Sequence, residues 1–472
     1  METGKRNIRI VMFPWLVHGH IISFLELAKA LAKRNFITHL YSTHANLNFF
    51  KKTLSLEEIR CVKLEVIQLP YLPEIPSRFH TTNGLSPRLV NTLKKAFLKG
   101  EPDFYSILDD LKPDLIIYDF LLPCIPLMAS TLNIPAVLFL TTSAASNSYH
   151  YRIRDTKPRI ASHFSNILRD HEYPFPEIFL RDHEHRRIKK MFKSLKNDGI
   201  DEKNGVTRCF ERSKEIILIK TFTELEGKYI DYNSFLFNKN FLPVGPLVRP
   251  FDHNDAAMRY GKIIEWLNEK EKSSTIFVCF GSECYLSKEE LKELALGMEL
   301  SMVNFLWVIR FPMEDETEIP DVLSDNFLER IWCERGVILE SWAPQKKILE
   351  HPSIGGFVSH CGWGSVMEAL SCGVPIIAMP MQHEQPLNTR LLVNDVGVGL
   401  EIQRDEEGNI RREGVAKTIR EVVLEESGES VRNKAKELKE RMRENGENDI
   451  DGVVDALVDL YKKTIRCGYY NP

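Results

Sequence analysis

Short apolar runs alternate with helical patterns along this chain, and that alternation restricts its fold more than any other feature. The segments 8–14, 114–119 and 134–140 read IRIVMFP, DLIIYD and IPAVLFL, and such short, β-branched runs are typical of buried strands. Between such runs lie segments with helical spacing, such as 23–35. Strands that alternate with helices every ~20–30 residues predict an α/β fold with a parallel, doubly wound sheet.

The alternating pattern occurs twice. A segment rich in proline and polar residues, 241–262, interrupts the pattern, and the apolar run 274–282 restarts it. The irregular stretch 149–213 is interpreted as a helical, loop-rich insertion over one rim of the first half. A chain of 472 residues is long enough for two or three domains. We therefore predict an N-terminal domain at 1–245, a linker at 246–262, a C-terminal domain at 263–450, and a terminal helix at 451–472 that packs back on the N-terminal domain.

Composition excludes several classes of protein. A net charge of −4 without blocks of like charge argues against a nucleic-acid partner. The nine cysteines include no CxxC pair, which argues against a zinc site or a secreted disulfide framework and favours a reducing compartment. Pro14 interrupts the apolar start of the chain, and no apolar run reaches the ~18 residues that a membrane span needs. We expect a cytoplasmic monomer without a membrane span.

The stretch 342–385 combines an aromatic residue, a glycine-bearing turn and a polar end. Within it, SHCGWGS (359–365) follows an apolar run and precedes a short helical segment. The turn therefore lies at a helix N-terminus, where backbone N–H groups and the helix dipole favour an anion. Trp342 can stack on a base, and the polar group at 383–385 suits a polyol. The whole stretch predicts a site for a nucleotide diphosphate that carries a sugar, although the turn alone could be an ordinary strand-to-helix turn with a satisfied histidine.

The same stretch resembles the signature box of the plant secondary-product UDP-sugar glycosyltransferases, within glycosyltransferase family 1. It begins with Trp, ends with Gln, has the full length of 44 residues, and contains WAPQ, HCGW, a Glu five residues beyond that Trp, and GVPI. Further similar motifs are FPW and GH near the start, FTELEGKY, VGPL and FGSE. The resemblance covers the whole chain. It implies a GT-B fold, in which two Rossmann-like, doubly wound domains face each other across a cleft, and sugar transfer with inversion.

The resemblance implies a donor-binding role for each matching position. Contacts to uracil and ribose would come from Trp342, Ala343, Gln345 and Glu368. Contacts to the diphosphate would come from Ser282, His360, Gly362, Trp363, Gly364 and Ser365. Gly19 and Thr141 are also expected to lie against the UDP-sugar. The sugar hydroxyls would be bound by Glu384 and Gln385, and the terminal Gln favours UDP-glucose.

The resemblance also implies that His20 is the general base. A hydroxyl acceptor has a pKa far above 7, so it must lose its proton as it attacks C1 of the sugar, and histidine suits that task. His18 is the competitor, but the Gly-His pairing of the family selects His20. Asp119 is the implied partner that orients the imidazole; by itself it could also be a helix N-cap. We expect no metal and no cofactor, because helix N–H groups can offset the charge on departing UDP.

The N-terminal stretch of the chain bears on the class of acceptor. The N-terminal stretch, with HTTNGL (80–85) and EYPFPE, is most similar to the subgroup that adds a sugar to the sugar of a flavonoid, triterpenoid or similar glycoside. Transfer to an aglycone hydroxyl is the alternative. Gly364 stands where the family box usually has Asn, which prompts a second alternative, a UDP-sugar-binding protein without activity. A nucleotide-sugar epimerase is disfavoured because GxGxxG is missing.

Overall fold

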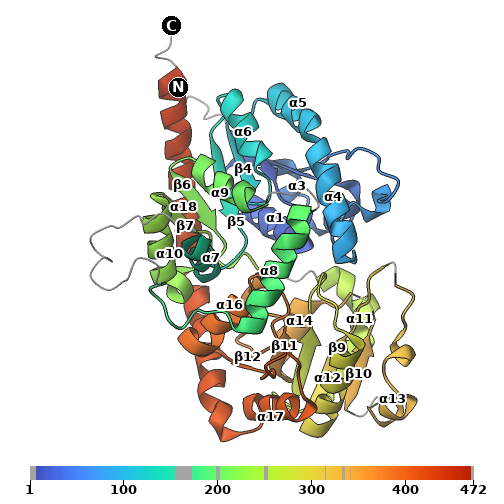
Figure 1. Ribbon diagram of the computed structural model, residues 1–472. Coiled ribbons are helices and arrows are strands. Elements are labelled where there is room, and N and C mark those ends of the chain that lie inside the picture. Colours follow the sequence, from blue (N-terminus) through green and yellow to red (C-terminus); the bar gives the residue numbers. More distant parts are fainter. Residues whose placement is uncertain are drawn as a thin grey trace. The chain divides into compact units, whose positions relative to one another are not determined.

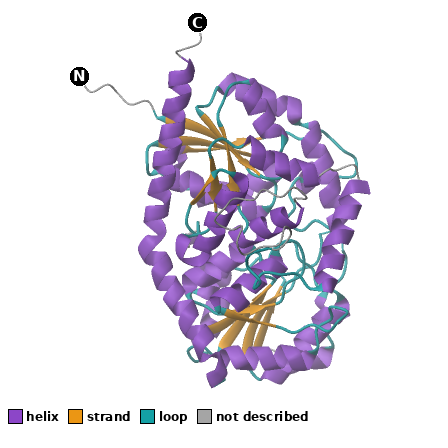
Figure 2. Cartoon of the chain, turned by 60° about the vertical axis from the view of Figure 1, so that its left-hand side comes forward, coloured by secondary structure: helices purple, strands orange, loops and turns teal. Residues whose placement is uncertain are grey.

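The computed structural model describes residues 7–154, 173–197, 202–248, 253–313, 315–331, 335–340 and 342–468. The chain forms two compact units. Unit 1 comprises Met1–Ala144, Phe192–Leu247 and Asn445–Pro472, and unit 2 comprises Ala145–Met191 and Val248–Glu444. In Figure 2 the strands gather into two separate sheets surrounded by helices. Each unit therefore has its own sheet and its own core.

Unit 1 is built on a seven-stranded sheet in the order β3-β2-β1-β4-β5-β6-β7. Every neighbouring pair is parallel. The strands are β1 (Ile8–Phe13), β2 (Phe36–Ser42), β3 (Val62–Val66), β4 (Leu115–Asp119), β5 (Ala136–Leu140), β6 (Ile216–Ile219) and β7 (Asn240–Pro243). The order reverses between β1 and β4. In doubly wound sheets, ligands bind at the carboxyl ends of the strands beside such a reversal.

Helices link the strands of unit 1 (Figure 1). They are α1 (His18–Ala32), α2 (His44–Phe50), α3 (Glu58–Cys61), α4 (Pro87–Lys99), α5 (Glu101–Leu111), α6 (Cys124–Thr131), α9 (Glu202–Arg212) and α10 (Thr223–Phe237), with short 3-10 turns at Lys51–Thr53 and Ser77–Phe79. The helical spacing at 23–35 predicts too late a start for the first helix, because α1 already begins at His18. Its N-cap, Val17, makes no side-chain cap hydrogen bond, so the usual Ser, Thr, Asp or Asn start signal is missing.

The end of the chain belongs to unit 1. The last helix, α18 (Glu429–Gly468), is a single helix of 40 residues, and its residues from 445 onward are part of this unit. Four of its apolar side chains join the core cluster that contains β1 and α1: Ile450, Val453, Leu457 and Leu460. Each buried aliphatic side chain contributes roughly 1.5–3 kcal/mol, so this helix is a substantial part of the fold of unit 1.

Unit 2 is built on a six-stranded parallel sheet in the order β10-β9-β8-β11-β12-β13. Its strands are β8 (Thr275–Cys279), β9 (Asn304–Val308), β10 (Gly336–Leu339), β11 (Ile354–Ser359), β12 (Ile376–Ala378) and β13 (Gly399–Glu401). The helices of its main segment are α11 (His253–Asn268), α12 (Lys288–Ser301), α13 (Asp325–Ile331), α14 (Gln345–Leu349), α15 (Trp363–Cys372), α16 (Gln385–Arg390) and α17 (Arg412–Val423). Short turns lie at Ile319–Asp321, Leu391–Val396 and Glu426–Gly428. The strand order reverses here between β8 and β11.

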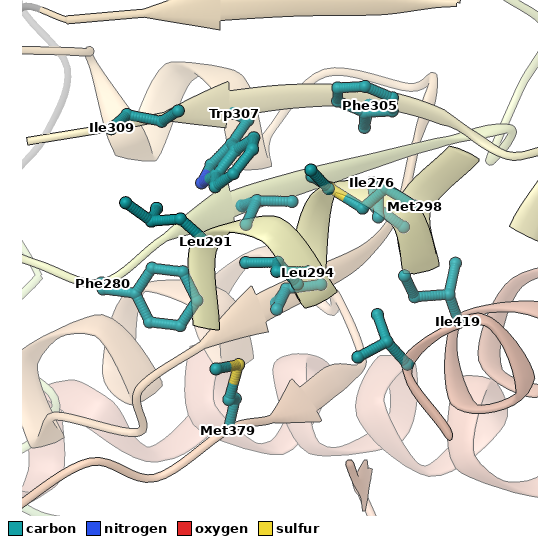
Figure 3. Close-up of a cluster of buried hydrophobic side chains, with 14 of the residues drawn as sticks. Ile276, Phe280, Leu291, Leu294, Met298, Phe305, Trp307, Ile309, Met379 and Ile419 are labelled. Carbon is teal, nitrogen blue, oxygen red and sulfur yellow. The ribbon is translucent and has the colours of Figure 1, made fainter. Parts of the chain in front are cut away.

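A hydrophobic core cluster of unit 2 lies between the helices α12 and α17 and one face of the sheet. Figure 3 shows the side chains that meet there from α12 and the strands: Leu291, Leu294, Met298, Ile276, Phe305 and Trp307. Phe280 and Met379, which directly follow β8 and β12, belong to the same cluster. The loops that begin at these two residues are therefore anchored in the core, and they are loops that carry predicted site residues.

Three segments differ from the predicted domain limits. Residues 445–450, which we assigned to the C-terminal domain, belong to unit 1, and the terminal helix begins at Glu429 and not at 451. Residues 145–191, which we assigned to the first half, belong to unit 2; they include α7 (Ala144–Arg154) from its second residue and the start of α8 (Asp182–Asn197), while 155–172 lie outside the described residues. The predicted linker 246–262 is partly helical, since α11 begins at His253, and 249–252 are not described. None of the helices in the described part of the chain is long and apolar enough to cross a membrane.

Candidate functional site

His20 and Asp119 meet at the carboxyl edge of the unit 1 sheet. Asp119 ends β4 and is fully buried, while His20 lies in the first turn of α1, directly after the neighbouring strand β1. Nδ1 of His20 is 2.6 Å from Oδ2 of Asp119. The carboxylate also accepts hydrogen bonds from the backbone N–H groups of Trp15 (3.2 Å) and Leu121 (3.1 Å). A carboxylate only accepts, so a neutral His20 carries its proton on Nδ1 and leaves the Nε2 lone pair to take a proton.

The structure distinguishes the two neighbouring histidines. The ring of His18 is buried and stacks on Phe50 at 5.1 Å, with Phe49 at its edge. His20 is the histidine that contacts Asp119. The alternative interpretation of Asp119, a helix N-cap, does not hold, because the next helix, α6, begins at Cys124 with Pro123 as its N-cap.

Two further candidates lie at the same edge of unit 1. Thr141 directly follows β5, and its buried Oγ1 makes no hydrogen bond within the described residues. Gly19 is exposed in the first turn of α1, and a Cβ added there would meet no atom within 4 Å. The Thr141 hydroxyl and the open backbone at Gly19 can therefore both contact a bound molecule.

In unit 2, His360 is enclosed by two glycines. It directly follows β11 and is 8% exposed, and burial lowers the pKa of its imidazole to about 4, so the ring is neutral at pH 7. A Cβ on Gly281 would lie 2.9 Å from ring atoms Cε1 and Nε2, and a Cβ on Gly362 would lie 2.4 Å from Nε2. Gly281 also has a φ of +73°, which L side chains rarely adopt. Both glycines are thus required by the packing of this ring.

The turn after His360 ends at a helix N-terminus, as the sequence predicts. Gly362 is the N-cap of the ten-residue helix α15 and supplies no capping side chain. The first residue of α15, Trp363, is buried, and Gly373 ends the helix with a φ of +70°. At Gly364 an added Cβ would meet no atom within 4 Å. The first N–H groups of α15 are therefore not capped by Gly362, and groups of this kind can donate hydrogen bonds to an anion.

Hydrogen bonds join two predicted nucleoside contacts, Gln345 and Glu368, to each other and to the predicted diphosphate contact Ser365. Nε2 of Gln345, the first residue of α14, donates to Oγ of Ser365 (3.1 Å) and to Oε2 of Glu368 (2.8 Å). Trp342 follows β10, and the guanidinium of Arg310, which follows the adjacent β9, lies 5.7 Å from the centre of its ring. Ala343 beside it is buried. The aromatic group predicted to hold a nucleoside thus lies in the loop after β10, and the carboxylate lies in α15, the helix that follows β11.

The predicted sugar contacts follow β12. Gln385 begins α16 and is 5% exposed; its Oε1 accepts from the backbone N–H groups of Met381 (3.0 Å) and Gln382 (2.9 Å). Glu384 precedes it and is half-buried. Ser282, also half-buried, lies in the loop after β8. The candidate residues therefore follow the order of the strands across the sheet. Predicted nucleoside contacts come after β10, predicted diphosphate contacts after β8 and β11, and predicted sugar contacts after β12.

Comparison with known proteins identifies the family. Residues 232–434 match the family model described as UDP-glucoronosyl and UDP-glucosyl transferase. UDP-glucosyltransferase 29 of Panax ginseng is 46% identical over 98% of this chain and 99% of its own. This chain belongs to the plant UDP-glycosyltransferases of family 1. A second relative of this glycosyltransferase is the β-D-glucosyl crocetin β-1,6-glucosyltransferase of Gardenia jasminoides, 41% identical over 96% of this chain and 99% of its own.

A solved structure agrees with the fold of this glycosyltransferase. The Glycyrrhiza uralensis protein UGT73P12, complexed with glycyrrhetinic acid 3-O-monoglucuronide, superposes with a TM-score of 0.82 at 23% identity and covers 98% of both chains. The predicted GT-B class, with two Rossmann-like α/β domains, is confirmed. Because the chain is a glycosyltransferase enzyme, the epimerase and the inactive sugar-binding protein are set aside.

Sequence reasoning missed two residues that contact candidate site residues. Arg310 was not considered, although it follows the strand-like run NFLWVI, and its cation lies over Trp342. Cys284 was passed over as a scattered cysteine, yet its Sγ is 3.4 Å from Nε2 of Gln385. Position at a strand's carboxyl end was the available signal for both. Within the described residues, no group of three or more His, Cys, Asp or Glu side chains could hold a metal ion.

Proposed function

We propose that this enzyme transfers glucose from UDP-glucose, with inversion, to a hydroxyl on the sugar of an existing plant glycoside. The observation that carries this proposal is the 2.6 Å contact between Nδ1 of His20 and the buried carboxylate of Asp119. A sugar hydroxyl is a poor nucleophile until its proton is removed, and an imidazole held by a carboxylate is a suitable base at neutral pH.

His20 acts as the general base in the proposed reaction. Asp119 holds the Nδ1–H, so the Nε2 lone pair accepts the proton of the acceptor hydroxyl while its oxygen forms a bond to C1 of glucose. The bond between C1 and the diphosphate oxygen breaks, and UDP leaves with that electron pair. The Asp119 carboxylate stabilises the imidazolium. General base catalysis of this kind contributes about 10²–10⁴-fold in rate.

Unit 2 holds the donor in this proposal. Trp342 stacks on uracil, with Ala343 beside it, while Gln345 and Glu368 bind the ribose. The N-terminus of α15 and its flanking donors bind the diphosphate and offset the negative charge that grows on departing UDP. Those flanking groups are Ser282, His360, Gly362, Trp363, Gly364 and Ser365, and from unit 1 we assign Gly19 and Thr141 to the same donor. No metal and no cofactor takes part in the proposed mechanism.

Glu384 and Gln385 bind the hydroxyls of glucose. A carboxylate accepts hydrogen bonds from hydroxyl groups, and a primary amide donates them, so the pair matches a polyol. The terminal Gln supports glucose as the transferred sugar. UDP-galactose, UDP-xylose and UDP-glucuronic acid are the competing donors.

Support for a glycoside acceptor comes from the relatives. The Gardenia jasminoides relative, 41% identical, is by its name a β-1,6-glucosyltransferase of β-D-glucosyl crocetin, which already carries a sugar. The alternative acceptor is an aglycone hydroxyl, to which the same base and donor site would apply.

Assays with paired acceptors distinguish transfer to the sugar of a glycoside from transfer to an aglycone hydroxyl. Purified enzyme with UDP-glucose is assayed against a flavonol and its monoglucoside, and against a triterpenol and its glucoside. We expect product from the glycosides, with the new glucose attached to the existing sugar. Product from the aglycones alone would contradict sugar-on-sugar transfer. Parallel assays with the three competing UDP-sugars test the choice of glucose.

A further inference from the structure

The side chain of Cys284 contacts the amide of Gln385, and no role for this cysteine follows from the reaction described above. We propose that Cys284 is a positioning residue that fixes the Gln385 amide in one orientation. In that orientation, Gln385 offers the donor sugar only N–H groups, and the neighbouring Glu384 supplies the hydrogen-bond acceptors. This inference rests on the proposed function, in which both residues bind the sugar of UDP-glucose.

The orientation of the Gln385 amide is set first by its own loop. Oε1 accepts from the backbone N–H of Met381 at 3.0 Å and from that of Gln382 at 2.9 Å. Backbone N–H groups only donate, so the flipped amide would place its NH₂ group against two donors. Both backbone donors would then lose their acceptor, which disfavours the flipped amide. The amide oxygen is therefore occupied within unit 2.

Cys284 holds the other end of the amide. Its Sγ lies 3.4 Å from Nε2 of Gln385 and 3.5 Å from Nε2 of Gln382. Cys284 is buried, and burial raises the pKa of its thiol to about 12, so the sulfur is a neutral, weak acceptor at pH 7. Gln385 thus directs one N–H to sulfur and has a second N–H for a ligand. A hydroxyl that meets this amide must accept a hydrogen bond.

The loop that carries Cys284 is fixed at both ends. Phe280 at its start belongs to the core of unit 2, as does Cys284 itself. Gly281 packs against the His360 ring, where an added Cβ would be only 2.9 Å from two ring atoms. Ser287 ends the loop with a capping box at the start of α12. Because the loop is held in this way, the sulfur atom is a rigid support for the Gln385 amide.

Calorimetric titration of purified variants with UDP and with UDP-glucose, without acceptor, tests the inference. We expect C284A to weaken UDP-glucose binding by about 3–10-fold and to leave UDP binding within about 2-fold, since UDP lacks the sugar. C284S should recover part of the loss, because a hydroxyl can also accept. Q385A is the reference for complete loss of the amide. C372A is the control, a cysteine at the end of α15 whose sulfur contacts Lys346 and Ser371.

Selectivity gives a second measurement. In C284A the amide is less restrained, so the ratio of kcat/KM for UDP-glucose over UDP-galactose should fall, with C284S between it and the wild type. The inference is overturned if Q385A weakens UDP-glucose binding while C284A does not. It is also overturned if C284A weakens UDP and UDP-glucose equally. Failure of the proposed function has a different signature, in which Q385A itself binds UDP-glucose as the wild type does.

Discussion

Two glycines of the same turn, Gly362 and Gly364, have opposite environments at the scale of single residues. A Cβ on Gly362 would meet Nε2 of His360 at 2.4 Å, whereas a Cβ on Gly364 would meet nothing within 4 Å. Gly362 is therefore required by packing. Gly364 is a position where the chain departs from the usual Asn of the family without any steric reason.

Gly364→Asn should fold normally and should keep or raise kcat with UDP-glucose. Asn is slightly more favourable than Gly inside a helix, by about 0.3 kcal/mol, and its amide adds a donor near the start of α15. Thermal unfolding and steady-state kinetics check both parts, with Gly362→Ala as the comparison that should lose UDP affinity. A large fall in kcat for Gly364→Asn would show instead that the site is built around glycine.

His360 should make stability depend on pH. Its folded pKa, about 4, lies below the ordinary 6.5. Above pH 6.5 the ring is neutral in both states. Between pH 6.5 and 4 the unfolded chain binds a proton that the folded chain does not, so the free energy of unfolding decreases as the pH falls, by about 3 kcal/mol in total.

His360→Gln removes this titration. Without UDP, the variant should lose less of its stability than the wild type between pH 6.5 and 4.5. The measurement is the unfolding temperature of both proteins at several pH values in that range. Parallel curves for the two proteins would contradict the buried, neutral imidazole.

At the scale of elements, a buried ion cluster attaches residues 181–184 to the rest of unit 2. Arg390, at the end of α16, is 1% exposed and binds Glu184 at 2.8 Å and Glu401 of β13 at 2.7 Å. Arg181 adds two bonds to Glu401, at 2.7 and 2.9 Å. The negative charges of the two carboxylates and the positive charges of the two guanidinium groups therefore balance. The cluster holds α16, whose first residue is Gln385, to β13 and to the start of α8.

Arg390→Met should destabilise the protein strongly, because it removes the 2.8 Å partner of the buried Glu184 and leaves Glu401 with Arg181 alone, at a cost of about 3–5 kcal/mol. We expect the unfolding temperature to fall by about 6 °C or more. Arg330→Met is the matched control: Arg330 binds Glu299 with two hydrogen bonds, but its side chain is half exposed, and its loss should change little. Equal effects of the two changes would show that the buried cluster has no special role.

The sequence predicted elements well where burial determines the pattern. Runs such as 134–140 are apolar because β5 is buried along its whole length, and Gly373 ends α15 with the positive φ that its position suggests. The start of α1 was missed because Val17 carries no cap signal. The placement of 145–191 was missed because it depends on ion pairs with residues more than 200 positions away, such as that of Glu184 with Arg390, which leave no local pattern.

The candidate site was predictable to a similar degree. The resemblance in 342–385 supplied the residues, and the sheet order places them at neighbouring strand ends. The contacts among them were not predictable, because the bond from Gln345 to Glu368 depends on how α14 lies beside α15. Cys284 was missed because its contact with Gln385 also depends on how segments far apart in the sequence pack together. Its position in FGSEC identifies the loop, but only the structure shows which side chain its sulfur meets.

At the scale of the whole molecule, the proposed reaction is divided between the two units. Unit 1 carries the proposed base His20 with its partner Asp119, and unit 2 carries most of the residues that we propose bind UDP-glucose. A change to the base should therefore stop transfer without weakening the donor complex, because His20 is not among the residues that we assign to donor binding and most of those residues lie in unit 2.

The most direct test combines donor binding and turnover in one variant, His20→Ala. The account predicts that kcat with UDP-glucose falls by about 10²-fold or more, while calorimetric affinity for UDP stays within about 2-fold of the wild type. His18→Gln serves as the control and should retain most of the activity of the folded protein. Near-normal turnover in His20→Ala, or loss of turnover in His18→Gln with UDP binding intact, would contradict the assignment of His20 as the base.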